Sequence, residues 1–227
     1  MSEVLRAERV GRTFGSGEAA VHALVDVDLV VEPGALTVVY GPSGSGKTTL
    51  LNLLGGLDRP TAGRVVLDDG RVLSELPEQE VLAVRRERIG YVFQSFGLIP
   101  VLSAAENVEV PLRLRKVAPA ERDRRVAEVL DQVGLGRHAG QRPYELSGGQ
   151  QQRVGIARAL VSAPDILIAD EPTGQLDSET AETVMELLVD LTRDRGIAAI
   201  VSTHDPVFMA LADRRVELLD GRVVVVR

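Results

Sequence analysis

The chain has 227 residues, of which 44% are hydrophobic and 26% charged, and this composition is typical of a globular protein with a sizeable core. Its formal net charge of -7 and its low aromatic content of 3% argue against a nucleic acid as the main partner. The absence of cysteine from the sequence excludes disulfides, thiolate catalysis and cysteine-based zinc sites.

Membrane insertion and secretion are also disfavoured by the sequence. No apolar run reaches the roughly 18 residues that a membrane-spanning helix needs. The first nine residues carry charges throughout and lack the apolar centre of a signal peptide. We therefore expect the chain to stay in the cytosol and to reach any membrane only through another protein.

The first hundred residues are predicted to contain mainly short strands. Apolar and polar side chains alternate in bursts separated by turn residues, which is the pattern of antiparallel strands. One apolar strand, residues 36–40, runs directly into a glycine-rich loop, and a helix is expected after that loop over 48–54. The expected strands are 4–10, 25–31, 36–40, 63–67, 71–73 and 89–93.

Helical periods dominate from about residue 103 to residue 160, with Pro119 marking one helix start. Residues 166–169 and 197–201 are continuous apolar runs, as expected for parallel strands buried on both faces. A hairpin is predicted near the end, over 215–226. These elements predict a three-layer α/β nucleotide-binding core that carries an inserted helical part.

The glycine-rich loop fits the phosphate-binding pattern G-x-x-x-x-G-K-[ST] and lies between a predicted strand and a predicted helix, a context that disfavours a chance match. Glycines let backbone N–H groups approach a phosphate closely, and the following helix directs its positive dipole end at the same anion. Lys47 would supply charge to the β- and γ-phosphates, and the Thr48 hydroxyl would bind Mg²⁺. The expected ATP contacts are Gly41, Pro42, Ser43, Gly44, Ser45, Gly46, Lys47, Thr48 and Thr49.

Two carboxylates, Asp170 and Glu171, follow the buried strand 166–169. Ligands bind at the carboxyl ends of strands in open α/β sheets. We expect Asp170 to hold Mg²⁺, directly or through water, and Glu171 to orient or deprotonate the attacking water. The alternative is a helix-capping pair before Pro172, but a phosphate loop in the same chain favours the catalytic interpretation.

A second anion-binding pattern occurs at Ser147, Gly148 and Gly149, immediately before a helix expected over about 151–161. A serine hydroxyl, exposed N–H groups and a helix dipole together favour an anion. Simple capping by Ser147 is nevertheless the usual explanation of an isolated Ser-Gly-Gly. Extended to Leu146 and Gln150, the segment reproduces the signature motif of the ABC superfamily letter for letter.

With its motifs in the family's order, the chain resembles an ABC transporter ATP-binding subunit over nearly its whole length. The resemblance implies a P-loop NTPase (RecA-like) core, made of residues 1–95 and 161–227, with an N-terminal antiparallel β subdomain. It also implies a helical subdomain over about 96–160 and an ATP-bound homodimer. Each ATP would be held by the phosphate loop of one copy and the signature motif of the other, so that hydrolysis releases the dimer.

The resemblance assigns roles to four further residues. Phe14 would stack on adenine, Gln94 would sense Mg²⁺ and water, Asp177 would contact the other protomer's site, and His204 would contact the γ-phosphate. Core packing is the alternative for Phe14, a strand-end cap for Gln94, and an ordinary hydrogen-bonded rim histidine for His204. Gln175 departs from the pattern, because similar proteins usually carry Asn or Ala there.

The sequences of 94–100, 106–108 and 111–112, together with those of 41–63 and 169–174, most resemble the macrolide-export and lipoprotein-release branch. In that branch, 94–100 with 106–108 and 111–112 would receive the coupling helix of a separate transmembrane permease. Cell-division ATPases, which regulate cell-wall hydrolases without transport, remain an alternative, whereas the acidic charge and single cassette disfavour a soluble ATPase acting on DNA or ribosomes. We expect an ATPase that uses ATP and Mg²⁺ and lies on the inner face of the membrane.

Overall fold

Two sheets organise the computed structural model, which describes residues 3–226. The strands in this part of the chain are β1 (Leu5–Phe14), β2 (Val21–Val31), β3 (Leu36–Tyr40), β4 (Ala62–Leu67), β5 (Ile89–Val92), β6 (Ile166–Asp170), β7 (Ala198–Ser202), β8 (Arg214–Leu219) and β9 (Arg222–Val226). A six-stranded sheet has the order β5-β6-β7-β3-β8-β9 and is parallel except for β9. A smaller antiparallel sheet has the order β2-β1-β4.

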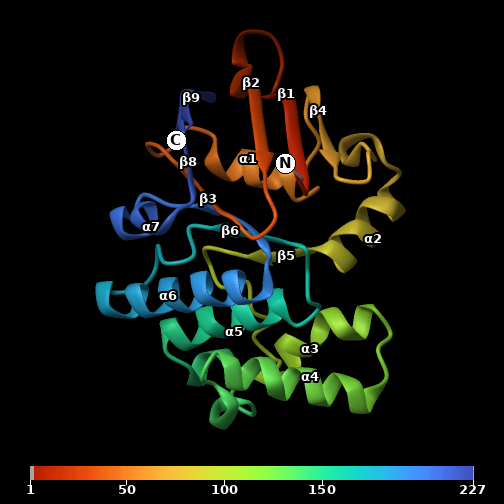
Figure 1. Cartoon of the computed structure of the whole chain (residues 1–227), viewed down its shortest axis with the longest axis vertical. Coiled ribbons are helices and arrows are strands. Elements are labelled where there is room, and N and C mark those ends of the chain that lie inside the picture. Colours follow the sequence, from red (N-terminus) through yellow and green to blue (C-terminus); the bar gives the residue numbers. More distant parts are fainter. Residues whose placement is uncertain (1–2, 227) are drawn as a thin grey trace.

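Helices cover both faces of the six-stranded sheet (Figure 1). The α-helices of the described residues are α1 (Lys47–Leu54), α2 (Glu78–Arg88), α3 (Ala104–Leu114), α4 (Pro119–Gln132), α5 (Gly148–Leu160), α6 (Ser178–Arg195) and α7 (Pro206–Leu211). Helix α1 lies between the two sheets, α5 and α6 cover the opposite face, and α3 and α4 lie farthest from the antiparallel sheet (Figure 1). None of the helices in residues 3–226 is both long and apolar enough to cross a membrane.

The larger sheet is buried on both faces, which explains its continuous apolar strands. On β6, Ile166 and Ile168 pack into the core shared with α1 and the antiparallel sheet. Leu167 and Ala169, which point the other way because side chains alternate along a strand, pack into the core shared with α5 and α6. The α/β class and the N-terminal antiparallel sheet predicted from the sequence are therefore confirmed.

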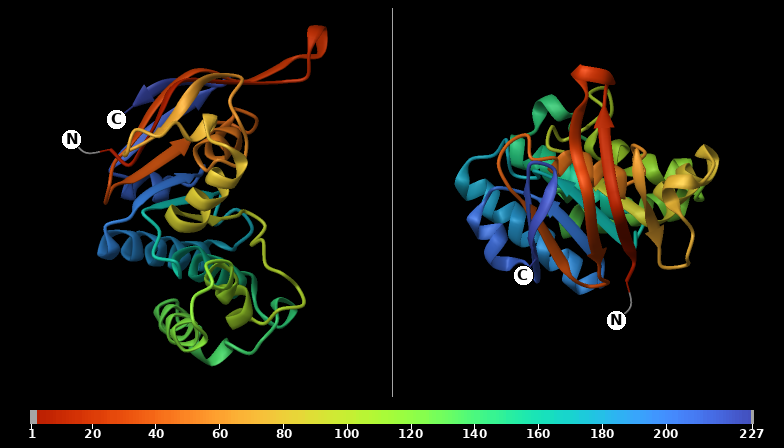
Figure 2. Two further views of the ribbon diagram at one scale, coloured as in Figure 1. Left: turned by 90° about the vertical axis from the view of Figure 1, so that its right-hand side faces the viewer. Right: turned by 90° about the horizontal axis from the view of Figure 1, so that it is seen from above.

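The parallel arrangement brings three loops to one edge of the sheet. Strands β3, β6 and β7 are hydrogen-bonded neighbours and end at Tyr40, Asp170 and Ser202. The loops that follow these residues therefore start side by side. The β1–β2 hairpin of the small sheet extends beyond the rest of the molecule (Figure 2).

The structure differs from the sequence prediction in residues 71–73 and in three helices, α2, α6 and α7, that had not been predicted as elements. Residues 71–73 do not form a strand: Val72 makes a single antiparallel bridge to Val66, and the chain then enters a 3-10 turn, Leu73–Glu75. Leu73 is buried in the core, so its apolar character reflects packing and not strand alternation. The helix α2 had not been predicted as an element, because only Val81 and Val84 of its residues are buried and its apolar periodicity is correspondingly weak.

Candidate functional site

The loop between β3 and α1 has a backbone that only glycine fits at two positions. Gly41 and Gly46 have φ values of 149° and 104°. A Cβ on Gly41 would overlap the carbonyl oxygen of Leu218, and one on Gly46 would overlap that of Ala23. The loop therefore packs tightly on its neighbours while the N-terminus of α1, which favours an anion, begins directly after it.

Lys47 lies over this loop. Its side chain is only 8% exposed, and its Nζ donates hydrogen bonds to the carbonyl oxygens of Gly41, at 2.9 Å, and Pro42, at 3.1 Å. The same Nζ is 3.9 Å from a carboxylate oxygen of Glu171. The ammonium is thus held between the glycine loop and the carboxylate that follows β6.

Asp170 is the buried centre of a small polar cluster. Its Oδ1 accepts hydrogen bonds from the Ser202 hydroxyl, at 2.6 Å, and from the Thr48 hydroxyl, at 3.2 Å. The backbone N–H of Glu171 also donates to Ser202 Oγ, at 2.9 Å. Ser202 had not been singled out in the sequence, although its position as a polar residue ending an apolar strand is a signal that points to this sheet edge.

Glu171 and His204 face each other across the site. His204 Nδ1 is 3.1 Å from Glu171 Oε2, and the imidazole is far more exposed than the carboxylate. Glu171 has a φ of 43°, in the left-handed region that non-glycine residues seldom adopt. A Cβ on Gly174 would lie 3.4 Å from both Gln94 Nε2 and Glu171 Oε2, which places the Gln94 amide beside the same carboxylate.

One cavity of about 810 Å³ is lined by the phosphate loop together with Gln94, Glu171 and His204. Asp170 and Ser45 lie beneath its surface, both nearly fully buried. Phe14 does not line the cavity. Its partner in the β1–β2 ladder, Val21, does. The lining consists of Val21, His22, Ala23, Gly41, Pro42, Ser43, Gly44, Gly46, Lys47, Thr48, Thr49, Gln94, Glu171, His204, Asp220 and Gly221.

The lining includes five residues that had not been predicted. Val21, His22 and Ala23 come from β2, and Asp220 and Gly221 form the turn between β8 and β9. The Gly221 N–H donates to the Ser45 carbonyl oxygen at 3.1 Å, which joins that turn to the phosphate loop. Such contacts between distant segments leave no pattern in the sequence.

The segment Ser147–Gln150 lies elsewhere and contributes nothing to the lining of this cavity. Ser147 caps α5: its Oγ accepts from the Gln150 N–H at 3.3 Å, and the Gln150 side chain accepts from the Ser147 N–H at 2.8 Å. The capping interpretation is therefore correct for Ser147, and it is compatible with anion binding by the neighbouring glycines.

Asp177 lies next to this segment. It caps α6 by accepting a hydrogen bond from the Thr180 N–H at 3.0 Å, and this bond lowers the pKa of the Asp177 carboxyl. A Cβ on Gly149 would overlap the Thr180 side chain, and one on Gly148 would lie 3.4 Å from Leu176. The structure thus groups Asp177 with the start of α5 and groups Gln94, Glu171 and His204 with the phosphate loop.

A family model described as ABC transporter matches residues 24–174, which is more than half of the chain. The chain belongs to the ABC transporter family. The predictions of an ABC ATPase cassette and of ATP as its nucleotide are thereby confirmed.

Named relatives support the same assignment. The cassette is 46% identical over 221 residues to the macrolide export ATP-binding/permease protein MacB of Marinobacter nauticus, covering 97% of the cassette but 34% of MacB. It is 44% identical over 220 residues to the lipoprotein-releasing system ATP-binding protein LolD 1 of Rhodospirillum rubrum, covering 97% of each chain. The cassette therefore spans about a third of the MacB relative.

A solved structure shares the fold over nearly the whole chain. The dimeric post-hydrolysis state of the ATP-binding cassette MJ0796, bound to ADP and Pi, superposes with a TM-score of 0.90. The two chains are 42% identical, and the match covers 98% of this chain and 97% of MJ0796. The P-loop type of core predicted from the sequence is consistent with this match.

Proposed function

We propose that the chain hydrolyses ATP and uses ATP-driven dimerisation to power a separate membrane permease of the macrolide-export or lipoprotein-release type. The observation that carries this proposal is the cavity at the sheet edge, where Lys47, Glu171 and His204 converge on one phosphate loop. MacB and LolD 1, whose names describe export and lipoprotein release, are the relatives that support the branch.

Nucleotide binding would use the phosphate loop and Phe14. Lys47 and the loop N–H groups would hold the β- and γ-phosphates, and Phe14 would stack on the adenine. Thr48, Asp170 and Gln94 offer hydroxyl, carboxylate and amide oxygens, the ligand type that Mg²⁺ prefers, and the first two oxygens already lie 3.2 Å apart. When bound, Mg²⁺ would neutralise charge that develops on the phosphate oxygens.

Hydrolysis would depend on Glu171. Its carboxylate would orient a water molecule against the γ-phosphate and accept its proton, while His204 would hydrogen-bond to the γ-phosphate. Lys47, 3.9 Å from the carboxylate, would share the phosphate charge. The bonds from Glu171 N–H to Ser202 fix the backbone from which the carboxylate projects.

A second copy of the chain would complete each site. Ser147, Gly148, Gly149 and Gln150 do not reach the cavity of their own chain, yet they begin a helix with an anion-binding arrangement. In a dimer, this segment would bind the γ-phosphate of the ATP held by the other copy. Asp177 would lie beside the segment at the interface. The dimeric state of MJ0796 supports this arrangement.

The permease would dock in a separate groove between α2, β5 and α3. This cavity of about 430 Å³ has exposed apolar side chains, among them Leu82 and Leu114, and a basic wall that includes Arg85 and Arg86. Of the residues expected to receive the permease, only Pro111 lines this cavity, whereas 94–100, 106–108 and Leu112 do not. The α2 wall had not been anticipated from the sequence. A short permease helix with apolar and acidic side chains fits this chemistry and would place the cassette on the inner face of the membrane.

Purification of a Glu171→Gln variant with ATP from detergent-solubilised membranes of its own host would test this function. We expect one multi-span protein in stoichiometric amount, and its loss when Leu82→Glu is added to the same variant. Its extracytoplasmic part would separate export from cell-division signalling. Recovery of soluble proteins alone, with the ATP-bound dimer intact, would contradict the permease proposal.

A further inference from the structure

Phe14, the proposed adenine platform, carries a cation on one face. It is the last residue of β1 and is 42% exposed, and the Arg12 guanidinium carbon lies 4.5 Å from the centroid of its ring. A guanidinium at this distance is attracted to the ring face. Because Arg12 covers one face, a nucleotide base can stack only on the other.

Arg12 is itself held in a fixed orientation. Its Nε and Nη2 donate to the two carboxylate oxygens of Asp58, at 2.8 and 3.0 Å, and both side chains are at most one-third exposed. Such a two-pronged arginine–carboxylate pair fixes the plane of the guanidinium as well as its position. Asp58 lies in the loop after α1, the helix that begins at the phosphate loop.

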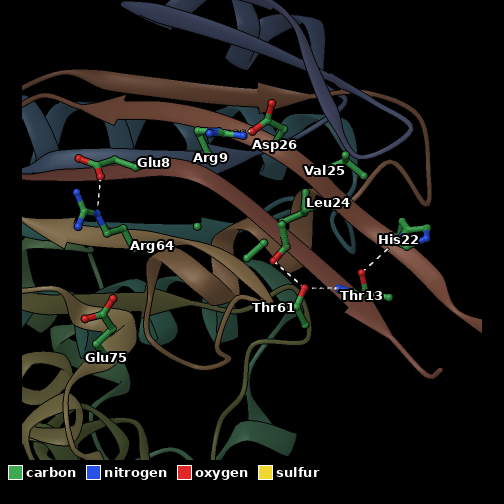
Figure 3. Close-up of a pocket in the computed structure, with 13 residues that line it drawn as sticks. Glu8, Arg9, Thr13, His22, Leu24, Val25, Asp26, Thr61, Arg64 and Glu75 are labelled. Carbon is green, nitrogen blue, oxygen red and sulfur yellow. Dashed lines mark hydrogen bonds and ion pairs between the residues drawn. The ribbon is translucent and has the colours of Figure 1, made fainter.

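Hydrogen bonds from Thr61 also join the same loop to β1 on either side of Arg12 (Figure 3). The Thr61 N–H and hydroxyl both donate to the Gly11 carbonyl oxygen, at 2.8 and 3.1 Å, and the Thr13 N–H donates to the Thr61 hydroxyl at 3.1 Å. The Thr13 hydroxyl is also hydrogen-bonded to His22, which lines the phosphate cavity. The backbone around Arg12 is thus fixed relative to the phosphate loop.

From this geometry we infer that Arg12, oriented by Asp58, is a positioning residue that holds the Phe14 ring ready for the base. The inference rests on the proposed stacking of Phe14 on adenine. Phe14 ends β1 where the hairpin loop begins, and the residue is 42% exposed, so an unsupported ring would lose rotational freedom each time a nucleotide binds. Support from Arg12 removes part of that cost before binding.

The test compares two ligands, ATP and inorganic tripolyphosphate, which share the phosphates but differ in the base. Arg12→Met and Asp58→Asn are expected to weaken ATP binding roughly 2- to 5-fold, the size of one exposed cation–π contact, and to leave tripolyphosphate binding unchanged. Arg12→Lys, which keeps the cation but loses the two-pronged pair, should lie between Arg12→Met and the wild type. Arg9→Met is the matched control, because Arg9 pairs with Asp26 on the same sheet (Figure 3).

The outcomes separate this inference from the function on which it rests. If Phe14→Ala leaves ATP affinity unchanged, the stacking assignment itself is wrong. If Phe14→Ala weakens ATP binding but Arg12→Met and Asp58→Asn do not, only the positioning role of Arg12 is wrong. An equal loss of tripolyphosphate affinity would also overturn it, as would a further loss of ATP affinity when Arg12→Met is added to Phe14→Ala.

Discussion

Glu171 is the residue at which backbone, charge and hydrogen bonding act together. Its positive φ, its N–H bonds to Ser202 and the neighbouring His204 fix the direction of the carboxylate. Lys47 provides the nearby positive charge. Because the surroundings hold the side chain in place, an amide of the same shape can replace the carboxylate and remove its basicity alone.

Glu171→Gln is therefore expected to bind ATP normally and to hydrolyse it about 100- to 1,000-fold more slowly, since a positioned base contributes on that order. The ATP-bound dimer should accumulate, which single-turnover assays and light scattering measure together. Glu186→Gln, an equivalent change on the exposed side of α6, is the control. A Glu171→Gln variant with wild-type turnover would exclude Glu171 as the base.

Lys47→Ala tests the binding step. The buried ammonium is the fixed charge nearest the phosphate loop, and its loss should reduce ATP affinity by two orders of magnitude or more, on the order of 3 kcal/mol. Titration calorimetry with ATP and Mg²⁺ measures the change, and the exposed Lys116→Ala provides the control. Unchanged affinity would show that the glycine loop is not the phosphate site.

At the scale of elements, the loop after Gln94 is tied to α5, the helix that begins at the signature motif. Arg158 donates to the carbonyl oxygens of Gly97, at 2.6 Å, and Phe96, at 3.2 Å. Burial lowers the pKa of this guanidinium. We therefore expect a displacement of α5 to move the segment that carries Gln94. The same arginine lines the proposed permease groove.

Arg158→Lys is expected to destabilise the fold by about 1–3 kcal/mol, because one ammonium cannot replace two directed, charge-assisted guanidinium bonds to backbone carbonyls. Turnover should fall as well, since Gln94 loses its support. Arg153→Lys is the matched control: Arg153 lies on the same helix but donates to Val133, away from the Gln94 loop. Denaturant melts and steady-state ATPase rates measure both effects, and equal rates in the two variants would contradict the coupling.

Local patterns made most of the elements and the phosphate loop predictable. The phosphate loop has a fixed sequence motif. The buried parallel strands are apolar runs that end at polar residues such as Asp170. Long-range contacts could not be predicted: nothing in the sequence pairs Arg12 with Asp58, or Arg158 with Phe96 and Gly97. The residue roles and subdomain boundaries carried over from the family stay predictions, because they concern a nucleotide, a second copy and a partner.

At the scale of the whole molecule, the phosphate-loop cavity and the start of α5 both have anion-binding arrangements, and they lie apart. The cavity holds Lys47 and Glu171, whereas Ser147 begins a helix outside its lining. The groove formed with α2 is a third separate surface. If the proposed function is right, a single copy carries only part of each working site, which would form between two copies with a permease bound to each groove.

Ser147→Arg tests the two-copy site, with the dimer stabilised by Glu171→Gln. A bulky cation at the start of α5 should prevent the ATP-dependent dimer while ATP still binds the monomer, because the cavity of the same chain does not include Ser147. Loss of the helix cap also costs stability, about 1 kcal/mol.

Ser103→Arg controls for that cost, because Ser103 caps α3 with the same reciprocal pair of bonds, to Glu106. Light scattering with ATP and calorimetry on the monomer measure the two steps. We expect both variants to melt earlier by a similar amount, and only Ser147→Arg to stay monomeric. Loss of ATP binding to the Ser147→Arg monomer would instead place Ser147 in the site of its own chain.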